Sequence, residues 1–330
     1  MKKIVNDPER VVQDMIQGLV TAHPGSVKQL PDTTVITRKD APVSGKVGLV
    51  SGGGSGHEPA HAGYVGKGML DAAVAGEVFT SPTPDQVLEA IKAVDSGAGV
   101  LLIIKNYTGD VMNFEMAAEM AEAEGIQVEK VVVNDDVAVE DSSFTSGRRG
   151  IAGTVFVHKI AGAMAEKGGS LQEVKAVAEK VIRNVRSMGV ATSPCTVPAA
   201  GKPSFELADD EMEVGIGIHG EPGIERKKVA TADEIAGELT DKIFTDLDFA
   251  NSDVAVMING LGATPEMELY IVNGKVQAIL ADQGMNVYKT FVGEFMTSLE
   301  MAGCSVTLLK LDNQLKELLD APSTAPAFYS

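Results

Sequence analysis

The sequence predicts an α/β subunit of two domains, in which a mainly parallel α/β sheet domain is followed by a C-terminal α+β domain. In the first half, short apolar runs alternate with segments of helical period, which is typical of a parallel sheet with helices on both faces. In the second half, alternating apolar residues and an Asn-Gly dipeptide indicate antiparallel strands. The 330 residues suffice for two cores, and we expect the domains to span residues 1–190 and 191–330.

The elements of the N-terminal domain follow from the spacing of its apolar residues. Buried strands are indicated by short apolar runs, which occur at 35–37, 47–50, 70–79, 100–104 and 128–133. Helical spacing recurs at 10–20, 84–95, 114–123 and from about 152 to 188, with an interruption at Gly168-Gly169. The two kinds of segment alternate along the chain, and this alternation predicts the parallel sheet.

A stretch rich in Pro, Ala and Thr at 194–203 marks the change to the second domain. Residues 213–219 alternate and predict a strand that ends at His219, and residues 254–258 are apolar throughout. Residues 269–280 are predicted as two strands around Asn273-Gly274. The reason is that Asn-Gly between apolar runs is the strongest short signal for a hairpin.

The composition excludes several classes of partner. A net charge of −18 leaves no basic footprint for phosphate neutralisation, so we expect no nucleic-acid partner. Cys195 and Cys304 share no metal-ligand spacing, and we interpret Cys195 as a small buried residue. The N-terminus lacks the apolar core of a signal peptide, and no stretch approaches the roughly 20 apolar residues of a membrane span. We therefore expect a cytoplasmic protein without a membrane partner.

The segment from Ser51 to His61 is the most informative candidate for a ligand site. It is predicted as the end of a strand, a glycine loop and the start of a helix. Glycines at 52, 53, 54 and 56 carry no Cβ, so backbone N–H groups can approach a small polar ligand; a purely structural glycine turn is the alternative. No Lys-Ser or Lys-Thr follows the glycines, so the loop favours a small oxygenated ligand over a nucleotide.

Two further polar groups follow predicted strands, where open α/β sheets place their ligands. Lys105 and Asp110 bound a polar stretch directly after the strand that ends at Ile104. A solvated loop in which Asp110 caps a helix is the alternative. His219 shares one face of its predicted strand with two glycines, and this pattern would leave space over the imidazole. Such space favours a ligand-bearing histidine over a buried structural one.

The remaining histidines point less clearly to chemistry. His61 follows His57 at a spacing of four residues, which would suit a metal pair on a helix. No third ligand stands near them in the sequence, so we favour a supporting role for His61 and expect no metal. His23 precedes a proline in a predicted loop and His158 stands in an apolar helix, and both are interpreted as structural.

Five motifs stand in order along the chain, at 51–61, 105–110, 147–154, 217–223 and 259–264. Their sequences include Ser-Gly-Gly-Gly-Ser-Gly-His, Lys-Asn-Tyr-Thr-Gly-Asp, Gly-Arg-Arg-Gly-Ile-Ala-Gly-Thr, Gly-Ile-His-Gly-Glu-Pro-Gly and Asn-Gly-Leu-Gly-Ala-Thr. Together they resemble the dihydroxyacetone kinase family, and in particular its substrate-binding DhaK subunits. The resemblance extends from about residue 3 to the C-terminal region, and it implies a homodimer of two-domain α/β subunits.

The resemblance also implies roles for individual residues. His219 is expected to form a covalent hemiaminal with the ketone carbon of dihydroxyacetone. His57 and Asp110 are expected to orient and activate the hydroxyl that attacks the phosphate. A start-of-helix position for Asp110 would favour its charged form. The residues expected to hold the triose are Lys105, Gly54, Ser55 and Gly56.

A nucleotide-carrying partner is implied as well. ATP-dependent members of the family carry a further nucleotide-binding domain, for which 330 residues leave no room. The chain is therefore expected to bind no cofactor and to receive phosphate from a DhaL-type subunit with bound ADP/ATP and Mg²⁺. A DhaM-type carrier of the phosphoenolpyruvate phosphotransferase system would recharge that nucleotide.

The alternative is a non-catalytic paralogue that binds dihydroxyacetone and acts on a transcription regulator. Such a relative would keep the covalent histidine without turning over its ligand. The presence of His57, Lys105 and Asp110 beside His219 favours the phosphotransferase subunit.

Overall fold

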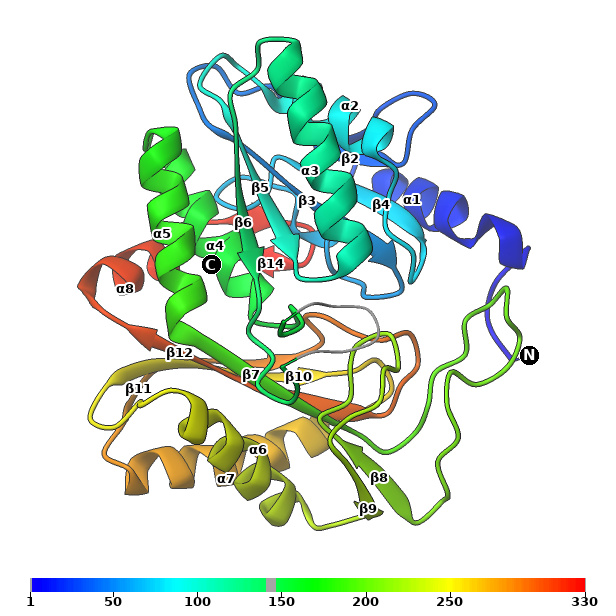
Figure 1. Ribbon diagram of the computed structural model, residues 1–330, viewed down its shortest axis with the longest axis vertical. Coiled ribbons are helices and arrows are strands. Elements are labelled where there is room, and N and C mark those ends of the chain that lie inside the picture. The colour runs from blue at the N-terminus through cyan, green and yellow to red at the C-terminus, as the bar shows by residue number, and fades with distance from the viewer. Residues whose placement is uncertain (1, 141–146, 330) are drawn as a thin grey trace.

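Two six-stranded sheets form the frame of the computed structural model, which describes residues 2–140 and 147–329. The first sheet and its helices occupy the upper half of Figure 1, and the second sheet with its own helices lies below it. The strands of the first sheet are β1 (Val27–Gln29), β2 (Val35–Arg38), β3 (Gly48–Ser55), β4 (Ala72–Val78), β5 (Val100–Lys105) and β6 (Val128–Val133).

The first sheet is mainly parallel, as predicted. Its order is β1-β2-β4-β3-β5-β6, in which β4, β3, β5 and β6 run parallel, while β2 pairs antiparallel with both β1 and β4. Its strand β5 is buried on both faces: Leu101 and Ile103 belong to one core cluster, while Val100, Leu102 and Ile104 belong to another. A strand covered on both faces is apolar throughout, which explains the continuous run in the sequence.

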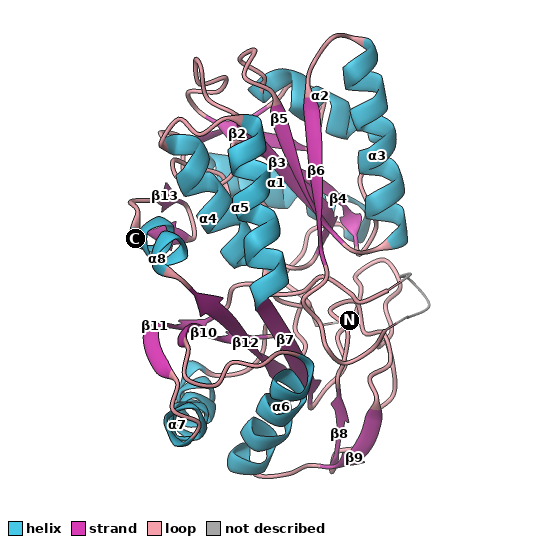
Figure 2. Ribbon diagram, turned by 60° about the vertical axis from the view of Figure 1, so that its left-hand side comes forward, coloured by secondary structure: helices cyan, strands magenta, loops and turns pink. Residues whose placement is uncertain are grey.

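Helices cover both faces of this sheet. The cluster on one face includes α2 (Pro84–Val94) and α3 (Thr108–Ala123), and the cluster on the other includes α1 (Val11–Ala22), α4 (Thr154–Glu166) and α5 (Leu171–Asn184). Figure 2 shows α3 on one side of the strands and α4 with α5 on the other. The interruption predicted between the last two helices is confirmed: Gly168 takes a left-handed φ of 85°, and Ser170 then caps α5 in a capping box with Glu173.

The second sheet is mainly antiparallel, which agrees with the predicted α+β domain. Its order is β11-β10-β12-β7-β8-β9, and β10 with β11 is its parallel pair. Helices α6 (Ala232–Asp246) and α7 (Glu266–Asp282) contribute to the core cluster of this sheet. The strands are β7 (Val185–Ala191), β8 (Glu211–Val214), β9 (Glu225–Lys228), β10 (Asp253–Gly260), β11 (Asn286–Gly293) and β12 (Gly303–Leu311).

The chain crosses between the two units near residue 185 and again near residue 312. The predicted helical pattern to residue 188 is wrong at its end, because residues from Val185 onward form β7 of the second sheet. The expected boundary at 190/191 falls inside this strand. After β12 the chain returns to the first unit and forms α8 (Asn313–Asp320), β13 (Thr324–Ala325) and β14 (Phe328–Tyr329). Residues of α8 and Phe328 pack in the core cluster that includes α4.

The predicted hairpin at 269–280 is wrong, since these residues lie within helix α7. Their buried members, Leu269, Val272, Val276 and Leu280, recur every three or four residues and form one apolar stripe. Gly274 is exposed, and nothing lies within 4 Å of the position that a Cβ would take there. Burial of the stripe therefore outweighs the turn preference of Asn-Gly and the cost of about 1 kcal/mol for a glycine in a helix.

The strand predicted to end at His219 stops earlier. Strand β8 ends at Val214, and Gly215 then adopts a left-handed φ of 75°, which takes the chain out of the sheet. Residues 215–219 consequently form a connection rather than one face of a strand. Because His219 does not lie in a strand, it does not share a strand face with Gly215 and Gly217, as the sequence had suggested.

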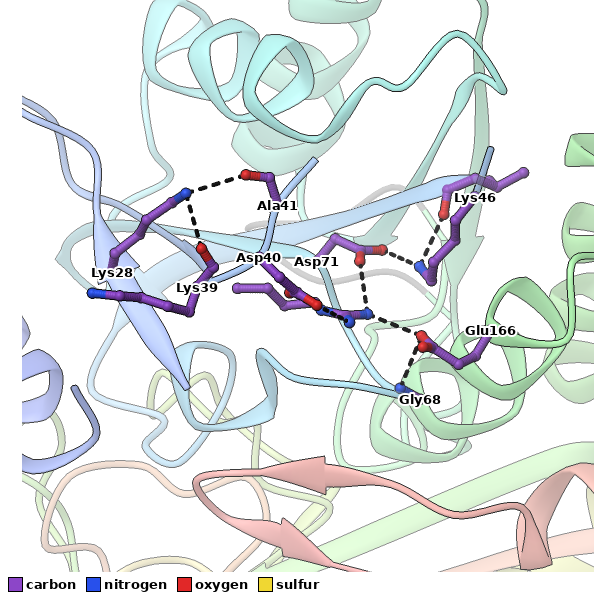
Figure 3. Close-up of polar contacts among 10 residues, drawn as sticks. Lys28, Lys39, Asp40, Ala41, Lys46, Gly68, Asp71 and Glu166 are labelled. Atoms are coloured by element: carbon purple, nitrogen blue, oxygen red, sulfur yellow. Dashed lines mark hydrogen bonds and ion pairs between the residues drawn. The ribbon is translucent and has the colours of Figure 1, made fainter. Parts of the chain in front are cut away.

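A buried ionic cluster lies at the amino ends of the parallel strands (Figure 3). Asp71, which directly precedes β4, accepts contacts from Lys46 Nζ at 2.5 Å and from Arg38 Nη1 at 3.3 Å. The same guanidinium group contacts Glu166 of α4 at 2.9 Å. Ligands of open α/β sheets bind at the opposite, carboxyl edge, so we interpret this cluster as structural. None of the described helices has the length and hydropathy of a membrane span.

Candidate functional site

A cavity of about 600 Å³ lies where the carboxyl ends of the parallel strands face the second unit. The first unit contributes the end of β3, the turn after β4 and the start of α3. The second unit contributes His219 from the connection between β8 and β9. The lining residues are Gly54, Phe79, Thr80, Ser81, Tyr107, Thr108, Gly109, Asp110, Asn113 and His219.

The predicted site residues converge at this cavity. Gly54, Asp110 and His219 line it directly. Ser55, Gly56, His57 and Lys105 are buried behind that lining. Residues separated by more than 160 positions in the sequence are thus brought together by the two units.

His57 and His219 face each other across the junction of the units. Their Nε2 atoms lie 3.1 Å apart, and the rings meet edge to face with centroids 4.7 Å apart. His57 is fully buried, whereas the side chain of His219 keeps 16% of its exposure. His219 is therefore the member of the pair that a ligand in the cavity can reach.

The outer nitrogen of each ring has a fixed partner, which sets its tautomer. Nδ1 of His57 lies 2.8 Å from the carbonyl oxygen of Thr297, so this nitrogen carries a hydrogen and donates it. Nδ1 of His219 lies 2.9 Å from Oε1 of Glu221, and Oε2 of the same carboxylate accepts the backbone N–H of His219 at 2.9 Å. Burial lowers the pKa of His57 well below its usual value, with Lys105 and His219 adding to the effect.

Glu221 is a residue of this site that the sequence reasoning missed. It is buried, which raises the pKa of its carboxyl, but the interaction with His219 and the nearby charge of Arg149 outweigh burial and bring the pKa to about 2. A charged carboxylate that holds both the ring and the backbone of His219 fixes the direction of the imidazole. Its position two residues after the histidine, within Gly-Ile-His-Gly-Glu, was the signal that could have identified it.

Two aromatic rings enclose His219, and these were also missed. The ring of Tyr107 lies edge to face against His219 with centroids 4.5 Å apart. Phe79 stacks on His57 at 5.1 Å and meets His219 edge to face at 5.2 Å. The rings restrict the imidazole from two sides and leave its Nε2 edge toward His57 and the cavity.

Lys105 and Asp110 come together beside Gly53. A Cβ on Gly53 would lie 3.3 Å from Oδ2 of Asp110 and 3.5 Å from Nζ of Lys105, so the missing side chain keeps both groups accessible. Lys105 is fully buried, and its Nζ has no hydrogen-bond partner among the described residues. Burial lowers the pKa of Lys105, while Asp110 and Glu221 oppose that effect. An unpaired buried ammonium is costly unless a ligand supplies acceptors for it.

The expectation that the helix start favours the charged form of Asp110 is wrong. Asp110 lies in the first turn of α3, as anticipated, and Oγ of Ser81 donates a hydrogen bond to it at 2.5 Å. Burial nevertheless raises the pKa of this carboxyl, although Lys105 and Ser81 lower it. Desolvation outweighs the helix dipole here because the dipole contributes at most about 2 kcal/mol even in partly buried positions. Asp110 is therefore suited to accept a proton at neutral pH.

The glycine segment differs in part from its prediction. Glycines 52 to 54 belong to strand β3, and the helix expected after them is absent: Ala62–Tyr64 form a single 3-10 turn. A Cβ on Gly52 would lie 2.4 Å from the oxygen of Val74, and one on Gly54 would lie 2.5 Å from the nitrogen of Thr80. Gly52 and Gly54 therefore permit close packing of the backbone, as in the alternative of a purely structural glycine turn. Gly53, in contrast, faces Lys105 and Asp110.

His61 does not form a metal pair with His57, because the two residues do not lie on a common helix. Nδ1 of His61 instead lies 2.9 Å from Nε2 of His158 on α4, and both rings are buried. Within residues 2–140 and 147–329, no group of three or more potential ligands gathers in a metal-binding arrangement. Cys195 is buried, as predicted, with its Sγ 3.4 Å from Oγ of Ser204.

Comparisons with known proteins identify the family of the chain. Residues 17–327 match the Dak1 domain family. The dihydroxyacetone-binding subunit DhaK of PTS-dependent dihydroxyacetone kinase 1 from Listeria innocua is 60% identical over 315 residues, which cover 95% of each chain.

Two solved structures are similar over almost the whole chain. The dihydroxyacetone kinase of C. freundii in its native form superposes with a TM-score of 0.92 at 37% identity, covering 100% of this chain and 60% of that one. The dihydroxyacetone kinase operon co-activator DhaQ superposes with a TM-score of 0.90 at 40% identity, covering 96% and 98% of the two chains. Given the family match and the 60% identity, the chain belongs to the Dak1 family, among the DhaK subunits of dihydroxyacetone kinases.

Proposed function

We propose that this chain is the dihydroxyacetone-binding subunit of a dihydroxyacetone kinase, a phosphotransferase that acts together with a nucleotide-carrying partner. The chain binds the ketone covalently through His219 and presents a hydroxyl group for phosphorylation to dihydroxyacetone phosphate. The observation that carries the proposal is the position of His219 Nε2, at the wall of a 600 Å³ cavity and 3.1 Å from His57. Lys105 and Asp110 lie together beside the same cavity.

The hydrogen bonds of the two histidines support a complete proton path for the covalent step. Both Nδ1 atoms donate outward, to Thr297 and to Glu221, so the Nε2–Nε2 contact is a hydrogen bond only when one further proton lies between the rings. Burial disfavours a charge on His57, and Nδ1 of His219 faces the carboxylate of Glu221 at 2.9 Å. In the proposed path this further proton starts on Nε2 of His219.

Attack then balances without any further reactant. The proton moves to Nε2 of His57, and the freed lone pair of His219 Nε2 forms a bond to the ketone carbon. The carbonyl π pair moves onto oxygen, which takes the proton from His57, and a neutral hydroxyl results. Glu221 holds the positive charge that remains on the alkylated ring.

A covalent bond suits this ligand. Noncovalent affinity is limited to roughly 1.5 kcal/mol per heavy atom at best, so a triose with several hydroxyls to desolvate would bind weakly. Bond formation adds affinity and requires a carbonyl carbon, which glycerol lacks. Rejection of a ligand that cannot react is stronger than rejection by shape.

Asp110 and Lys105 serve the phosphoryl transfer. Asp110 accepts the proton of the attacking hydroxyl, and its raised pKa suits that task near neutral pH. His57 and Asp110 together orient that hydroxyl, which matters more than early proton removal in a loose transition state. The unpaired ammonium of Lys105 donates to a triose oxygen, with Gly54, Ser55 and Gly56 forming the wall beside it.

We infer that the phosphate comes from a DhaL-type subunit that carries ADP/ATP and Mg²⁺, and that a DhaM-type carrier recharges it. Two of the similar proteins are subunits of PTS-dependent dihydroxyacetone kinases, which supports this inference. A cytoplasmic homodimer is part of the same proposal. This chain holds no cofactor in the proposed reaction.

A sensing paralogue is the second candidate, because the co-activator DhaQ is similar in fold and 40% identical. The two candidates differ in turnover. The test mixes the chain with a DhaL-type subunit, a phosphate source and dihydroxyacetone, and measures dihydroxyacetone phosphate. Product that depends on both proteins supports the kinase subunit. Covalent binding of dihydroxyacetone without any product would contradict it and favour the sensor.

A further inference from the structure

Arg149, in the motif at 147–154, is a buried cation that the proposed reaction does not use. We propose that Arg149 is a positioning residue that places a positive charge near the carboxylate of Glu221 and thereby keeps His219 ready to lose its Nε2 proton. This role for Arg149 rests on the proposed function in one respect, which is that His219 is the nucleophile. Its physical claim concerns the charge balance around His219, which can be measured without any ligand.

The guanidinium of Arg149 is fixed on two sides. Its Nε and Nη2 atoms each lie 2.8 Å from Oδ2 of Asp136, and Nη2 donates to the carbonyl oxygen of Gly215 at 2.7 Å. Gly215 begins the connection that carries His219, so Arg149 anchors that connection at its first residue. Arg149 and Asp136 are both fully buried.

The third nitrogen of Arg149 lies near the carboxylate of Glu221, although the two groups make no ion pair within 4 Å. Nη1 is buried and makes no hydrogen bond within the part of the chain that the structure describes. A Cβ on Gly217 would lie 2.6 Å from this nitrogen and 2.0 Å from Oε2 of Glu221. Gly217 therefore marks the point at which the two charged groups approach each other. This is the purpose of the glycine two residues before His219, in place of the open space expected over the imidazole.

The charges explain why such a cation is useful. Glu221 orients His219 by accepting both its Nδ1–H and its backbone N–H. A buried carboxylate with no other partner would also hold the ring as an imidazolium, and an imidazolium has no lone pair for attack. A guanidinium beside the carboxylate offsets part of that stabilisation. Glu221 can then fix the direction of the ring without trapping its proton.

Several other charged or titratable groups face this assembly, and all of them except Arg149 and Asp136 stay unchanged in the test. His219 is faced by His57, Asp110, Glu221 and Tyr107. Glu221 is faced by His219, Arg149, Lys105 and Tyr107. Arg149 is faced by Asp136, Tyr107 and Glu221.

The test compares Arg149→Met with matched variants of the full chain. Asp136→Asn keeps the guanidinium but removes its partner, and the double variant Arg149→Met/Asp136→Asn removes both without leaving Asp136 as an unpaired buried charge. Arg148→Met changes the neighbouring arginine, which instead pairs with Asp246. Thermal unfolding of each variant shows which ones are folded and can be compared.

The first measurement is the titration of the His219 ring in ligand-free protein, by NMR of labelled histidine. We expect Arg149→Met and the double variant to move the His219 midpoint upward by about one pH unit. Arg148→Met and Asp136→Asn should stay near the wild-type midpoint. An unchanged midpoint in a folded Arg149→Met protein would overturn the proposal, as would a double variant that returns to the wild-type midpoint.

The second measurement is the rate at which ¹³C-carbonyl-labelled dihydroxyacetone exchanges with its tetrahedral bound form. We expect this rate in Arg149→Met to be reduced near neutral pH by about tenfold and to recover at higher pH, with partial rescue in Arg149→Lys. A loss that is equal at every pH would indicate a structural role alone and count against the proposal. If the wild type itself forms no tetrahedral carbon, the proposed function fails, while the His219 titration still decides the role of Arg149.

Discussion

The Nε2 atoms of His57 and His219 lie 3.1 Å apart although the two residues belong to different sheets. His57 follows the end of β3, and His219 lies in the connection after β8. The β11–β12 connection holds the segment of His57 against the second unit, because Thr297 accepts from the ring of His57 and Leu299 donates its N–H to the oxygen of Gly56 at 2.7 Å. The site therefore exists only when the two units are docked, and the following predictions test what it does.

Replacement of the expected nucleophile should abolish tight binding and carbonyl selectivity together. In His219→Ala the bond to the ketone carbon cannot form, so dihydroxyacetone and glycerol should bind with similarly weak affinity. Calorimetry with both ligands measures this, and a crystal of wild-type protein soaked in dihydroxyacetone checks the bond directly. A ketone carbon well beyond bonding distance from Nε2 of His219 would contradict the covalent proposal.

Asp110→Asn should keep ligand binding and lose turnover. The amide preserves the shape of the carboxyl group but cannot accept a proton, and general-base contributions are typically 10²- to 10⁴-fold in rate. Turnover is measured in the reconstituted system, and Ser81→Ala, which removes the hydrogen-bond donor, should show a smaller loss. Because the pKa of Asp110 is raised, wild-type turnover should decline on acidification at a higher pH than an ordinary aspartate would produce. A near-normal rate in Asp110→Asn removes this residue from the mechanism.

The isolated chain should show no kinase activity with dihydroxyacetone and Mg-ATP. No P-loop lysine follows its glycines, and its net charge of −18 works against unaided capture of a free polyphosphate. The assay follows dihydroxyacetone phosphate with and without a DhaL-type partner. Robust product from the chain alone would show that the partner is not obligatory.

Glu221→Gln should destabilise the fold at neutral pH, by about 1 to 3 kcal/mol. The folded-state pKa of Glu221, about 2, lies below the ordinary value of 4.5, so its contribution is complete above pH 4.5 and declines as pH falls toward 2. Urea unfolding from pH 7 to 4 measures the difference. The difference in unfolding free energy between wild type and Glu221→Gln should stay constant down to about pH 5 and become smaller below pH 4.5. Glu225→Gln, on the exposed strand β9, serves as the control. A difference that widens on acidification would contradict this assignment.

Gly274→Ala distinguishes helix α7 from the hairpin that the sequence suggested. In a helix, with open space around the Cβ, alanine should stabilise the protein by about 0.5 to 1 kcal/mol. In an Asn-Gly turn the same change would be destabilising, because the turn needs a positive φ at the glycine. The urea midpoint measures the sign directly. Gly125→Ala, at a glycine with φ of 88° and similar open space, should be destabilising and provides the contrast.

Local periodicity was sufficient to predict most strands and helices of the first unit, although β1 and α8 were not predicted and the helix expected after the glycine segment is absent. Val100 to Ile104 and the helices at 84–95 and 114–123 are confirmed, because burial on one or two faces leaves a regular pattern of apolar residues. The sequence also contained the motifs that hold His57, Lys105, Asp110 and His219. Lys105 ends strand β5 and His57 follows β3, so these motifs lie at the carboxyl edge of the parallel sheet as expected, whereas the strand end expected at His219 was wrong.

The tertiary structure alone decided how those motifs meet and in which charge state. The apolar stripe of α7 is distinguished from a hairpin only by the core that covers it, and the end of β8 depends on the left-handed turn at Gly215. The raised pKa of Asp110, the carboxylate of Glu221 behind His219, and the approach of Arg149 through Gly217 all depend on burial between the two units. Burial and charge proximity are properties of residues far apart in the chain, so spacing within the sequence carries no record of them.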